Sequence, residues 1–285
     1  MISLVGAVVF VLLAPVIGGI VAGIDRKVTA HMQGRVGPSI FQPFYDVGKL
    51  FEKEGAVVND TQHFYVLSYF VFAIFAGALF FAGGNLLLVV FALTLAEVFL
   101  VLGAYAANSP YSHIGAEREL IQIMAYEPML LLAAVGMYVV TRSFNVSDIA
   151  GFPGYLVILL PGVFFGFIYI LTIKLRKSPF DISTSHHAHQ EIVKGVMTEF
   201  SGPNLGFIEV AHWYEMVFLL GFVFLFFAVN WLIAIIAIII VYLLELAIDN
   251  TNARVKWQLA VKSSWAVALI LGAGNIAILY LLGRV

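Results

Sequence analysis

The sequence predicts an all-α integral membrane protein with about eight transmembrane helices. Three observations favour this fold class. Hydrophobic residues make up 62% of the chain and charged residues only 11%, and a soluble domain with this composition would expose far too much apolar surface. The apolar residues form long continuous runs, and the mean hydropathy is +0.99. The basic residues gather between alternate runs. We therefore expect one polytopic domain, residues 1–285, as a multi-pass protein of the cell (cytoplasmic) membrane.

The spans are recognised by their length. About 20 apolar residues in a helix cross a hydrocarbon core of about 30 Å. Because the runs are continuously apolar and do not alternate, helices are favoured over the strands of a barrel. The expected spans are Ile2–Ile24, Phe64–Ala82, Leu86–Ala107, Leu120–Val140, Tyr155–Ile173, Phe207–Ala228, Asn230–Ile248 and Ser264–Leu282.

The distribution of positive charge predicts the orientation. Thirteen of the 15 Lys and Arg residues follow spans one, three, five and seven, whereas only Arg142 and Arg284 lie on the other side. Short loops rich in Lys and Arg remain in the cytoplasm. We therefore expect both termini on the outside, with long cytoplasmic loops after helices 1 and 5.

The first cytoplasmic loop contains an amphipathic segment. Gly37-Pro38 breaks any helix there, and from Phe41 onward aromatic residues fall on one helical face and charged residues on the other. This pattern is typical of a helix lying at the membrane surface. Such a helix could be a plain interfacial anchor, or Arg35, Asp46 and Lys49 could line a contact with a soluble partner.

Acidic residues occur inside the apolar runs. Glu97 lies near the middle of its span, and Glu127 is followed by Pro128, which removes a backbone donor and leaves a polar gap beside the acid. An ionised carboxylate at bilayer depth costs roughly 2.5 kcal/mol or more, so such a residue normally faces a partner or a wet cavity.

Two further acids lie close to a histidine in the sequence. Glu209 and Glu215 straddle His212 at the start of span six, and their spacing places all three on one broad helical face. Each acid could be a satisfied structural pair, for example with Arg118 or His212, but so few basic residues lie at depth that we do not expect pairing throughout. A series of carboxylates with a histidine is typical of a proton relay, and its expected members are Glu97, Glu127, Glu209, His212, Glu215 and Glu245.

The third cytoplasmic loop carries a histidine cluster, His186, His187 and His189, followed by Glu191. This spacing does not match the i, i+4 pattern of metal ligands on a helix, and the chain has no cysteine to assist. We expect these side chains to pack at a protein interface or to tune proton entry, and Ser183–Ser185 could cap a short helix. Without thiolates the chain cannot hold an iron–sulfur cluster in the usual way.

Four motifs carry a family resemblance. GRVGP (Gly34–Pro38), with QPFYDVGKLFEKE after it, resembles the first cytoplasmic loop of the complex I membrane subunit that joins the peripheral arm to the membrane arm. AYEP (Ala125–Pro128) resembles the acid motif at the start of one of its spans. SPFDI (Ser178–Ile182) and TEFSG (Thr198–Gly202) resemble its third cytoplasmic loop. The motifs occur in the right order across most of the chain, and eight spans match the family core.

One departure points to a particular branch. Quinone-reducing members are rich in acids after PFD, whereas this chain reads ISTSHHAHQEIVKG. The STSHHAHQE form resembles the membrane subunit of group 4 energy-converting nickel–iron hydrogenases and their sulfur-reducing relatives. The resemblance implies a membrane-anchor and coupling subunit of a ferredoxin-linked hydrogenase complex, which is not itself the catalytic chain.

The resemblance also implies the partners. These are a hydrogenase-like large subunit, a small [4Fe-4S] subunit, antiporter-like membrane subunits, ferredoxin as electron donor, and the lipid bilayer, with no nucleic acid. We expect the nickel–iron centre and the iron–sulfur clusters in partner subunits and no cofactor or metal bound by this chain. The residues expected to face partners are Arg35, Asp46, Lys49, Glu117, Arg118, Asp181, His186, His187, His189, Glu191 and Glu199.

Three alternatives remain at this point. The chain could be the homologous subunit of a sulfur-reducing relative, or of a quinone-reducing complex I in which the loops enclose a quinone chamber. A stand-alone ion transporter is a third possibility, against which the large basic loops count. The sequence leaves the pumped ion, H⁺ or Na⁺, open.

Overall fold

The protein is helical throughout the part of the chain that the computed structural model describes, residues 3–55, 60–180, 183 and 194–283. Within these residues no β-strand forms. The helices are α1 (Leu4–Met32), α2 (Gln42–Glu52), α3 (Asp60–Phe81), α4 (Leu86–Ala106), α5 (Pro110–Thr141), α6 (Val146–Ala150), α7 (Leu156–Leu159), α8 (Pro161–Lys174), η1 (Gly195–Met197), α9 (Gly202–Leu225), α10 (Trp231–Thr251), α11 (Trp257–Val267), η2 (Ala268–Ala273) and α12 (Gly274–Leu281).

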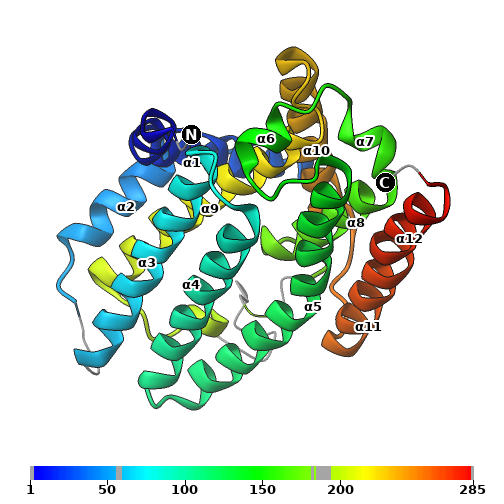
Figure 1. Ribbon diagram of the computed structural model, residues 1–285. Helices are drawn as coiled ribbons and strands as arrows, with labels where there is room; N and C mark the ends of the chain where they lie inside the picture. The colour runs from blue at the N-terminus through cyan, green and yellow to red at the C-terminus, as the bar shows by residue number, and fades with distance from the viewer. Residues whose placement is uncertain (1–2, 56–59, 181–182, 184–193, 284–285) are drawn as a thin grey trace.

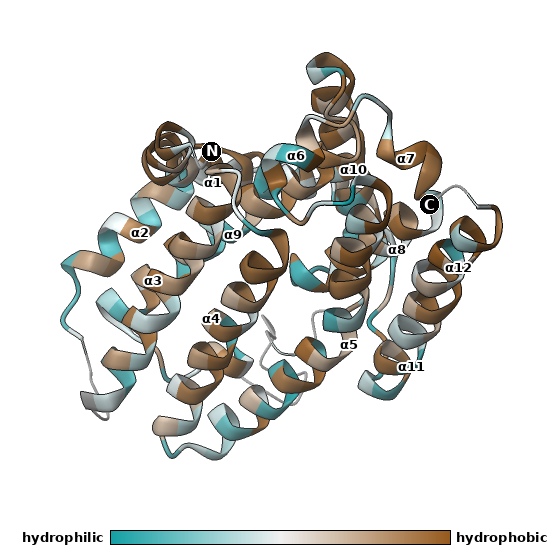
Figure 2. Cartoon of the chain, in the orientation of Figure 1, coloured by the Kyte–Doolittle hydropathy of each residue, from teal (hydrophilic) through white to brown (hydrophobic). Residues whose placement is uncertain are grey.

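The hydropathy prediction of an all-α membrane fold is confirmed. In the described part of the chain, seven helices are long and apolar enough to cross a membrane, counting the continuous helix Trp257–Leu281 as one. Apolar residues dominate these helices, and polar residues gather toward their ends and connections (Figure 2). Helices α1 and α5 continue for two to three turns beyond the expected spans, so residues such as Glu117 lie on a helix and not in a loop.

The expected span Tyr155–Ile173 is not one continuous helix. It divides at Leu160 into α7 and the longer α8. Pro161 explains the break, because a proline disfavours helical geometry in the residue before it, and Leu160 has φ −118° and ψ 46°. The dipeptide Pro161-Gly162 therefore carried a signal for this break.

Asn275 of α12 satisfies the broken backbone. Its Oδ1 accepts hydrogen bonds from the N–H groups of Gly162 (2.8 Å) and Val163 (3.3 Å), and its Nδ2 donates to the carbonyl of Leu159 (3.2 Å). Non-helical backbone at membrane depth is tolerated only where the protein supplies such partners. The last helix passes through the π-helical turn η2 beside this break, and a side chain at Gly162 would collide with the carbonyl of Leu271.

The amphipathic segment after Phe41 forms α2, as expected. Its aromatic face is shared between the surface and the protein. Phe44 packs against the ring of Trp213 on α9 at a centroid distance of 5.2 Å and lies directly over Gly19 of α1, where no side chain would fit. Tyr45 stays exposed. Helix α2 therefore packs against α1 and α9 and keeps part of its aromatic face exposed.

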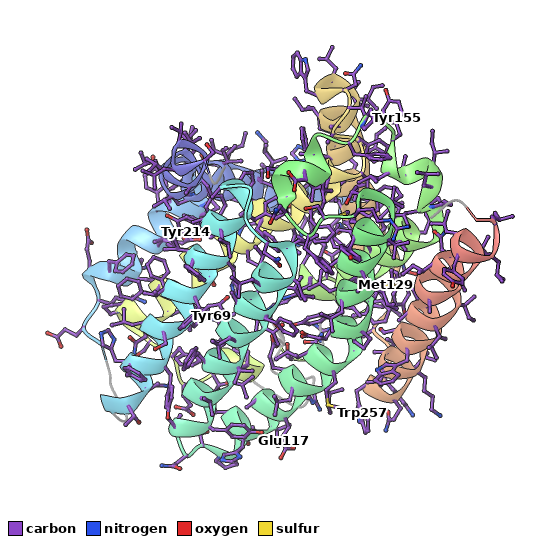
Figure 3. The ribbon with its side chains drawn as sticks, viewed as in Figure 1. Tyr69, Glu117, Met129, Tyr155, Tyr214 and Trp257 are labelled. Carbon is purple, nitrogen blue, oxygen red and sulfur yellow. The ribbon has the colours of Figure 1, made fainter. Side chains whose placement is uncertain are left out.

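Helices α3, α4 and α5 lie side by side, with α9 crossing behind them and α11 packed against α5 (Figure 1). The chain reverses between helices, so α1, α4, α8 and α10 end where α3, α5, α9 and α11 begin. We call this end the basic side, because it carries the basic connections. Glu117 and Trp257 lie at this edge, and Tyr155 lies at the opposite edge (Figure 3). The interior between the two ends is strongly aromatic and includes Phe80, Phe167, Phe218, Phe222 and Phe226.

Candidate functional site

The segment Lys174–Lys177, KLRK, ends α8 and carries three cations. Lys174 is the last helical residue, and Arg176 follows in the left-handed conformation with φ 53°. The N–H of Lys177 bonds to the carbonyl of Thr172 (3.1 Å) and that of Arg176 to Ile173 (3.0 Å). This is a Schellman ending in which arginine replaces the usual glycine. It turns the chain sharply, so the three cations leave the helix end in different directions, close to its negative dipole.

Lys174 lies between two acids from different helices. Its Nζ contacts Glu97 Oε1 on α4 and Glu215 Oε1 on α9, the latter at 3.0 Å. The side chains are almost fully buried, with exposed fractions of 2% for Lys174, 4% for Glu97 and 7% for Glu215. The ammonium also lies 4.4 Å from the ring centre of Tyr126 on α5. One cation thus pairs with two carboxylates in the middle of the bundle. We call Glu97, Lys174 and Glu215 the central triad.

Arg176 forms a second buried pair. Its Nη2 donates to Glu119 Oε1 on α5 at 2.9 Å, and the exposed fractions are 13% and 4%. Within the described residues, Nη1 of Arg176 has no hydrogen-bonding partner. This buried donor is therefore free for an additional polar group.

Lys177 repeats the arrangement of one lysine with two acids nearer the surface. Its Nζ lies 2.7 Å from Asp25 Oδ2 on α1 and 3.5 Å from Asp249 Oδ2 on α10. The hydroxyl of Tyr242 donates to the same oxygen of Asp25 at 2.8 Å. Asp249 also accepts the N–H of Ser178 at 2.8 Å. We call Asp25, Lys177 and Asp249 the outer triad.

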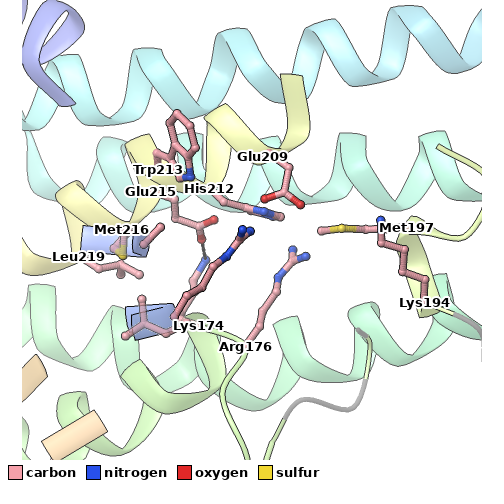
Figure 4. A pocket seen from close by; sticks show the side chains of 13 residues that line it. Lys174, Arg176, Lys194, Met197, Glu209, His212, Trp213, Glu215, Met216 and Leu219 are labelled. Atoms are coloured by element: carbon pink, nitrogen blue, oxygen red, sulfur yellow. Dashed lines mark hydrogen bonds and ion pairs between the residues drawn. The ribbon is translucent and has the colours of Figure 1, made fainter. Parts of the chain in front are cut away.

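A cavity of about 310 Å³ opens beside the central triad. Glu209, His212 and Glu215 line it from α9, and Arg176 reaches in from the opposite wall (Figure 4). The helical spacing predicted that these three α9 residues share a face, and the structure confirms this. Within the described residues, Nε2 of His212 has no partner. Apolar side chains complete the wall, among them Trp213, Met197, Met216 and Leu219.

A second cavity, of about 270 Å³, adjoins the first on the side of α2. The two share Arg26, Lys194, Glu209 and Trp213 in their walls. Asp46 and Lys49 of α2 line this second cavity, and Asp46 pairs with Arg26 at 2.6 Å. Together the cavities lead from the surface helix α2 toward the central triad.

The remaining acids of the expected relay lie apart from these cavities. Glu127 accepts a hydrogen bond from Thr94 on α4 at 2.7 Å. Glu245 is fully buried on α10. The structure therefore brings Glu97, Glu209, His212 and Glu215 together but leaves these two at separate positions.

Three of the buried acids are paired with a cation, whereas no ion pair is found for Glu127 or Glu245 among the described residues, so pairing does not extend to all the acids. Glu97, Glu215 and Glu119 each contact a cation, and neither Arg118 nor His212 is that cation. The cations are Lys174 and Arg176, which sequence reasoning placed in a cytoplasmic loop. Their long side chains reach back from the helix end into the bundle, and only their position directly after span five hinted at this.

Of the residues expected to face partners, the described ones lie toward the basic side. Arg35, Lys49 and Glu117 are exposed, whereas Asp46, Arg118 and Glu199 are partly buried. Asp181, His186, His187, His189 and Glu191 lie outside the described residues, as does the short helix expected near Ser183. Among the described residues, no group of three or more His, Asp or Glu side chains is arranged to hold a metal ion.

Comparison with known proteins agrees with this architecture. The chain is 26% identical over 294 residues to hydrogenase-4 component C of Escherichia coli (strain K12), covering 92% of this chain and 90% of the relative. It is 30% identical over 226 residues to a subunit of the NADH-quinone oxidoreductase of Anoxybacillus flavithermus (strain DSM 21510 / WK1), covering 71% and 67%. A chain in the structure of the membrane-bound sulfane sulfur reductase, an archaeal respiratory membrane complex, superposes with a TM-score of 0.83 at 26% identity and covers 96% and 98%.

These relatives are subunits of multi-subunit membrane complexes, and the resemblance found in the four sequence motifs extends over nearly the whole chain. The sequence pattern of the NADH dehydrogenase family matches residues 4–280. The chain is thus a membrane subunit of a complex I-like assembly and belongs to the NADH dehydrogenase family.

Proposed function

We propose that this chain is the membrane-anchor and coupling subunit of a ferredoxin-linked, energy-converting nickel–iron hydrogenase complex. Its basic side would hold a hydrogenase-like large subunit and a small [4Fe-4S] subunit, and its flank would meet antiporter-like membrane subunits. The match to hydrogenase-4 component C over 92% of this chain supports the hydrogenase branch. The nickel–iron centre and the clusters would reside in the partners, since this chain has no cysteine.

The observation that carries the coupling role is the KLRK segment. Its three cations contact acids on α1, α4, α5, α9 and α10, and its chain continues directly into the third loop on the basic side. A partner that shifts this loop would displace several ion pairs at once. Charge rearrangement at the surface would thereby reach the middle of the membrane.

The central triad gives this displacement a chemical consequence. Lys174 serves both Glu97 and Glu215. When one of the two acids takes up a proton, the ammonium is left to the other. Protons would enter along Glu209 and His212 in the cavity wall, and Glu127 and Glu245 would be further proton-carrying acids at separate positions in the membrane.

Two observations favour complexes with a different terminal electron acceptor. The structural similarity to a chain of the sulfane sulfur reductase supports a homologous role in a sulfur-reducing complex. The relatives at 30% identity include subunits of NADH-quinone oxidoreductases, which supports a quinone-reducing complex as a further alternative. All three share the coupling role and differ in the partner that carries the redox chemistry.

Purification of the intact complex through a tag on this chain tests the choice. We expect nickel in the purified complex and hydrogen evolution driven by reduced ferredoxin. A nickel-free complex that reduces sulfur compounds or quinones with the same donor would contradict the hydrogenase assignment and favour the corresponding alternative.

The orientation is part of the proposal, and the absence of native cysteines makes it simple to test. Glu117 on the basic side and Asp148 on α6 are both exposed, at opposite ends of the bundle. In intact cells, a membrane-impermeant thiol reagent should label Asp148→Cys and spare Glu117→Cys. The reverse pattern would place the basic side outside.

A further inference from the structure

Glu245 is a buried acid that lines neither of the two cavities. It lies on α10 with 0% exposure, and within the described residues neither carboxyl oxygen makes a full hydrogen bond, although the side chain of Thr172 on α8 lies near enough to interact with it. An ionised carboxylate in such a place would lose its hydration with no full hydrogen bond to replace it, at a cost of several kcal/mol. The neutral, protonated acid avoids this cost. Burial therefore favours the protonated form of Glu245.

The groups around Glu245 come from each helix packed against α10. The titratable groups acting on it are Lys177, which follows α8, and Tyr242 and Asp249 on α10 itself, and the side chain of Thr172 reaches it from α8. Asp25 of α1 joins them through Lys177. From α9 the contribution is apolar, since Met216 and Leu220 belong to the hydrophobic cluster around Leu246.

Exposure falls steadily from the outer triad to Glu245. The side chains of Asp25 and Asp249 are 24% and 27% exposed, that of Lys177 is 7% exposed, and Glu245 is fully buried. Asp249 lies four residues after Glu245, so the two acids are neighbours on one helical face. Water on the basic side thus reaches an acid one helical turn from Glu245.

This approach differs from the route through the cavities. None of Asp25, Lys177, Glu245 and Asp249 belongs to the residues that line the two cavities. The cavities end at Glu215 and Lys174, on the other side of the KLRK segment. The two triads therefore face separate acids from separate directions.

We infer that Glu245 is a proton-binding site that exchanges with water on the basic side through the outer triad, independently of the cavity that leads to Glu215. In the exchange, the carboxyl of Glu245 gives its proton to the carboxylate of Asp249, which releases it to water. Lys177 then compensates the negative charge left on Glu245, and the net charge of the site is conserved once a proton returns. In the proposed coupling role, this site would be a second point of proton entry. That use of the site rests on the proposed function, whereas the exchange itself does not.

Infrared spectroscopy of the full-length chain in lipid nanodiscs tests this site without any turnover. The difference spectrum between the wild type and Glu245→Gln should contain the C=O band of a protonated carboxylic acid at neutral pH. On transfer to D₂O this band should shift as the proton exchanges. In Lys177→Met the exchange should slow at least about tenfold, equivalent to about 1.4 kcal/mol in the barrier.

Matched variants separate this route from the central one. Lys177→Arg keeps the cation and should exchange at nearly the wild-type rate. Glu215→Gln alters the cavity route and should leave the exchange of Glu245 unchanged. If Lys177→Met does not fold, Asp249→Asn provides the same test, because it leaves the pair of Lys177 and Asp25 in place.

Three results would overturn the inference. They are the absence of a carboxylic acid band that depends on Glu245, exchange that slows in Glu215→Gln as much as in Lys177→Met, and loss of the band on adding Na⁺ at constant pH. The last would mean that a metal cation occupies the site. Because no hydrogenase partner takes part, failure here leaves the proposed hydrogenase assignment standing, and failure of that assignment leaves this measurement intact.

Discussion

The central and outer triads use the same arrangement of one lysine between two acids. Their lysines, Lys174 and Lys177, are three residues apart in the chain. They differ in depth. The side chains of Glu97 and Glu215 are 4% and 7% exposed, whereas those of Asp25 and Asp249 are 24% and 27% exposed. Water can therefore hydrate the two acids of the outer triad if Lys177 is lost, but not the two acids of the central triad if Lys174 is lost.

This difference decides what each triad can do. Removing one member of a buried ion pair strands an uncompensated charge, whereas an exposed pair contributes little because both members are already hydrated. The central triad is therefore suited to transmit a change of charge through the protein. The outer triad is suited to exchange protons with solvent.

The largest effect is expected for Lys174→Met. This change leaves Glu97 and Glu215 buried without a cation, and it should lower the free energy of unfolding by about 3–5 kcal/mol. Reversible denaturation in mixed micelles measures this loss. The triple variant with Glu97→Gln and Glu215→Gln should recover most of the stability, because no charge is then stranded. If Lys174→Met lowered the free energy of unfolding no more than Lys177→Met does, the proposed difference between the two triads would be contradicted.

An intermediate effect is expected for Arg176→Gln. Glu119 is 4% exposed and would lose its charged partner, so the free energy of unfolding should fall by about 1–3 kcal/mol. Arg176→Gly relieves the left-handed backbone conformation as well and should be the more stable of the two variants by roughly 1 kcal/mol. Equal stability of the two would show that the backbone at this residue carries no strain.

A smaller loss is expected for Lys177→Met. Asp25 and Asp249 can regain hydration, so we expect a decrease of about 1–2 kcal/mol. Added salt should reduce the difference from the wild type here, because the outer triad is partly exposed. The corresponding difference for Lys174→Met should not depend on salt. An equal salt dependence in both would contradict the assigned depths.

The smallest effect is expected at the surface pair of Arg26 and Asp46, whose side chains are 46% and 43% exposed. Arg26→Gln should cost less than about 1 kcal/mol. Partial burial by itself would raise the pKa of Asp46, but hydrogen bonds from Gln42 and Arg26 outweigh it and lower the pKa. The pair therefore stabilises the protein above the ordinary aspartate pKa of about 3.9 and loses this contribution as the pH falls through the lowered value.

A denaturation series over pH checks this sign. The wild type and Arg26→Gln should differ at neutral pH and converge in acid. A difference that grew toward low pH would mean that another group is responsible.

The sequence was sufficient to predict every span except Tyr155–Ile173, because hydropathy and length reflect the bilayer directly. The boundaries of Leu86–Ala107, for example, agree with α4 within one residue. The amphipathic α2 and the shared face of Glu209, His212 and Glu215 also followed from helical spacing alone. These features depend on local periodicity, which a single sequence displays.

The pairing of charges could not be predicted in the same way. Lys174, Arg176 and Lys177 read as loop cations, since nothing in the sequence shows that α8 ends beside α4, α5 and α9. The left-handed turn at Arg176 has no glycine, the residue by which such a turn is usually predicted from sequence. The contacts that define the central triad join residues 41 and 77 positions apart, and such distances are set by packing alone.

The most direct test of the coupling role measures two products at once. In inside-out vesicles that contain the complex, ferredoxin-driven hydrogen evolution and ion uptake are recorded together for Glu127→Gln, Glu215→Gln and the exposed control Asp148→Asn. The account predicts that the first two variants evolve hydrogen with strongly reduced ion uptake per hydrogen, whereas the control keeps the wild-type ratio. Full ion-gradient formation together with undiminished hydrogen evolution in both Glu127→Gln and Glu215→Gln would contradict it.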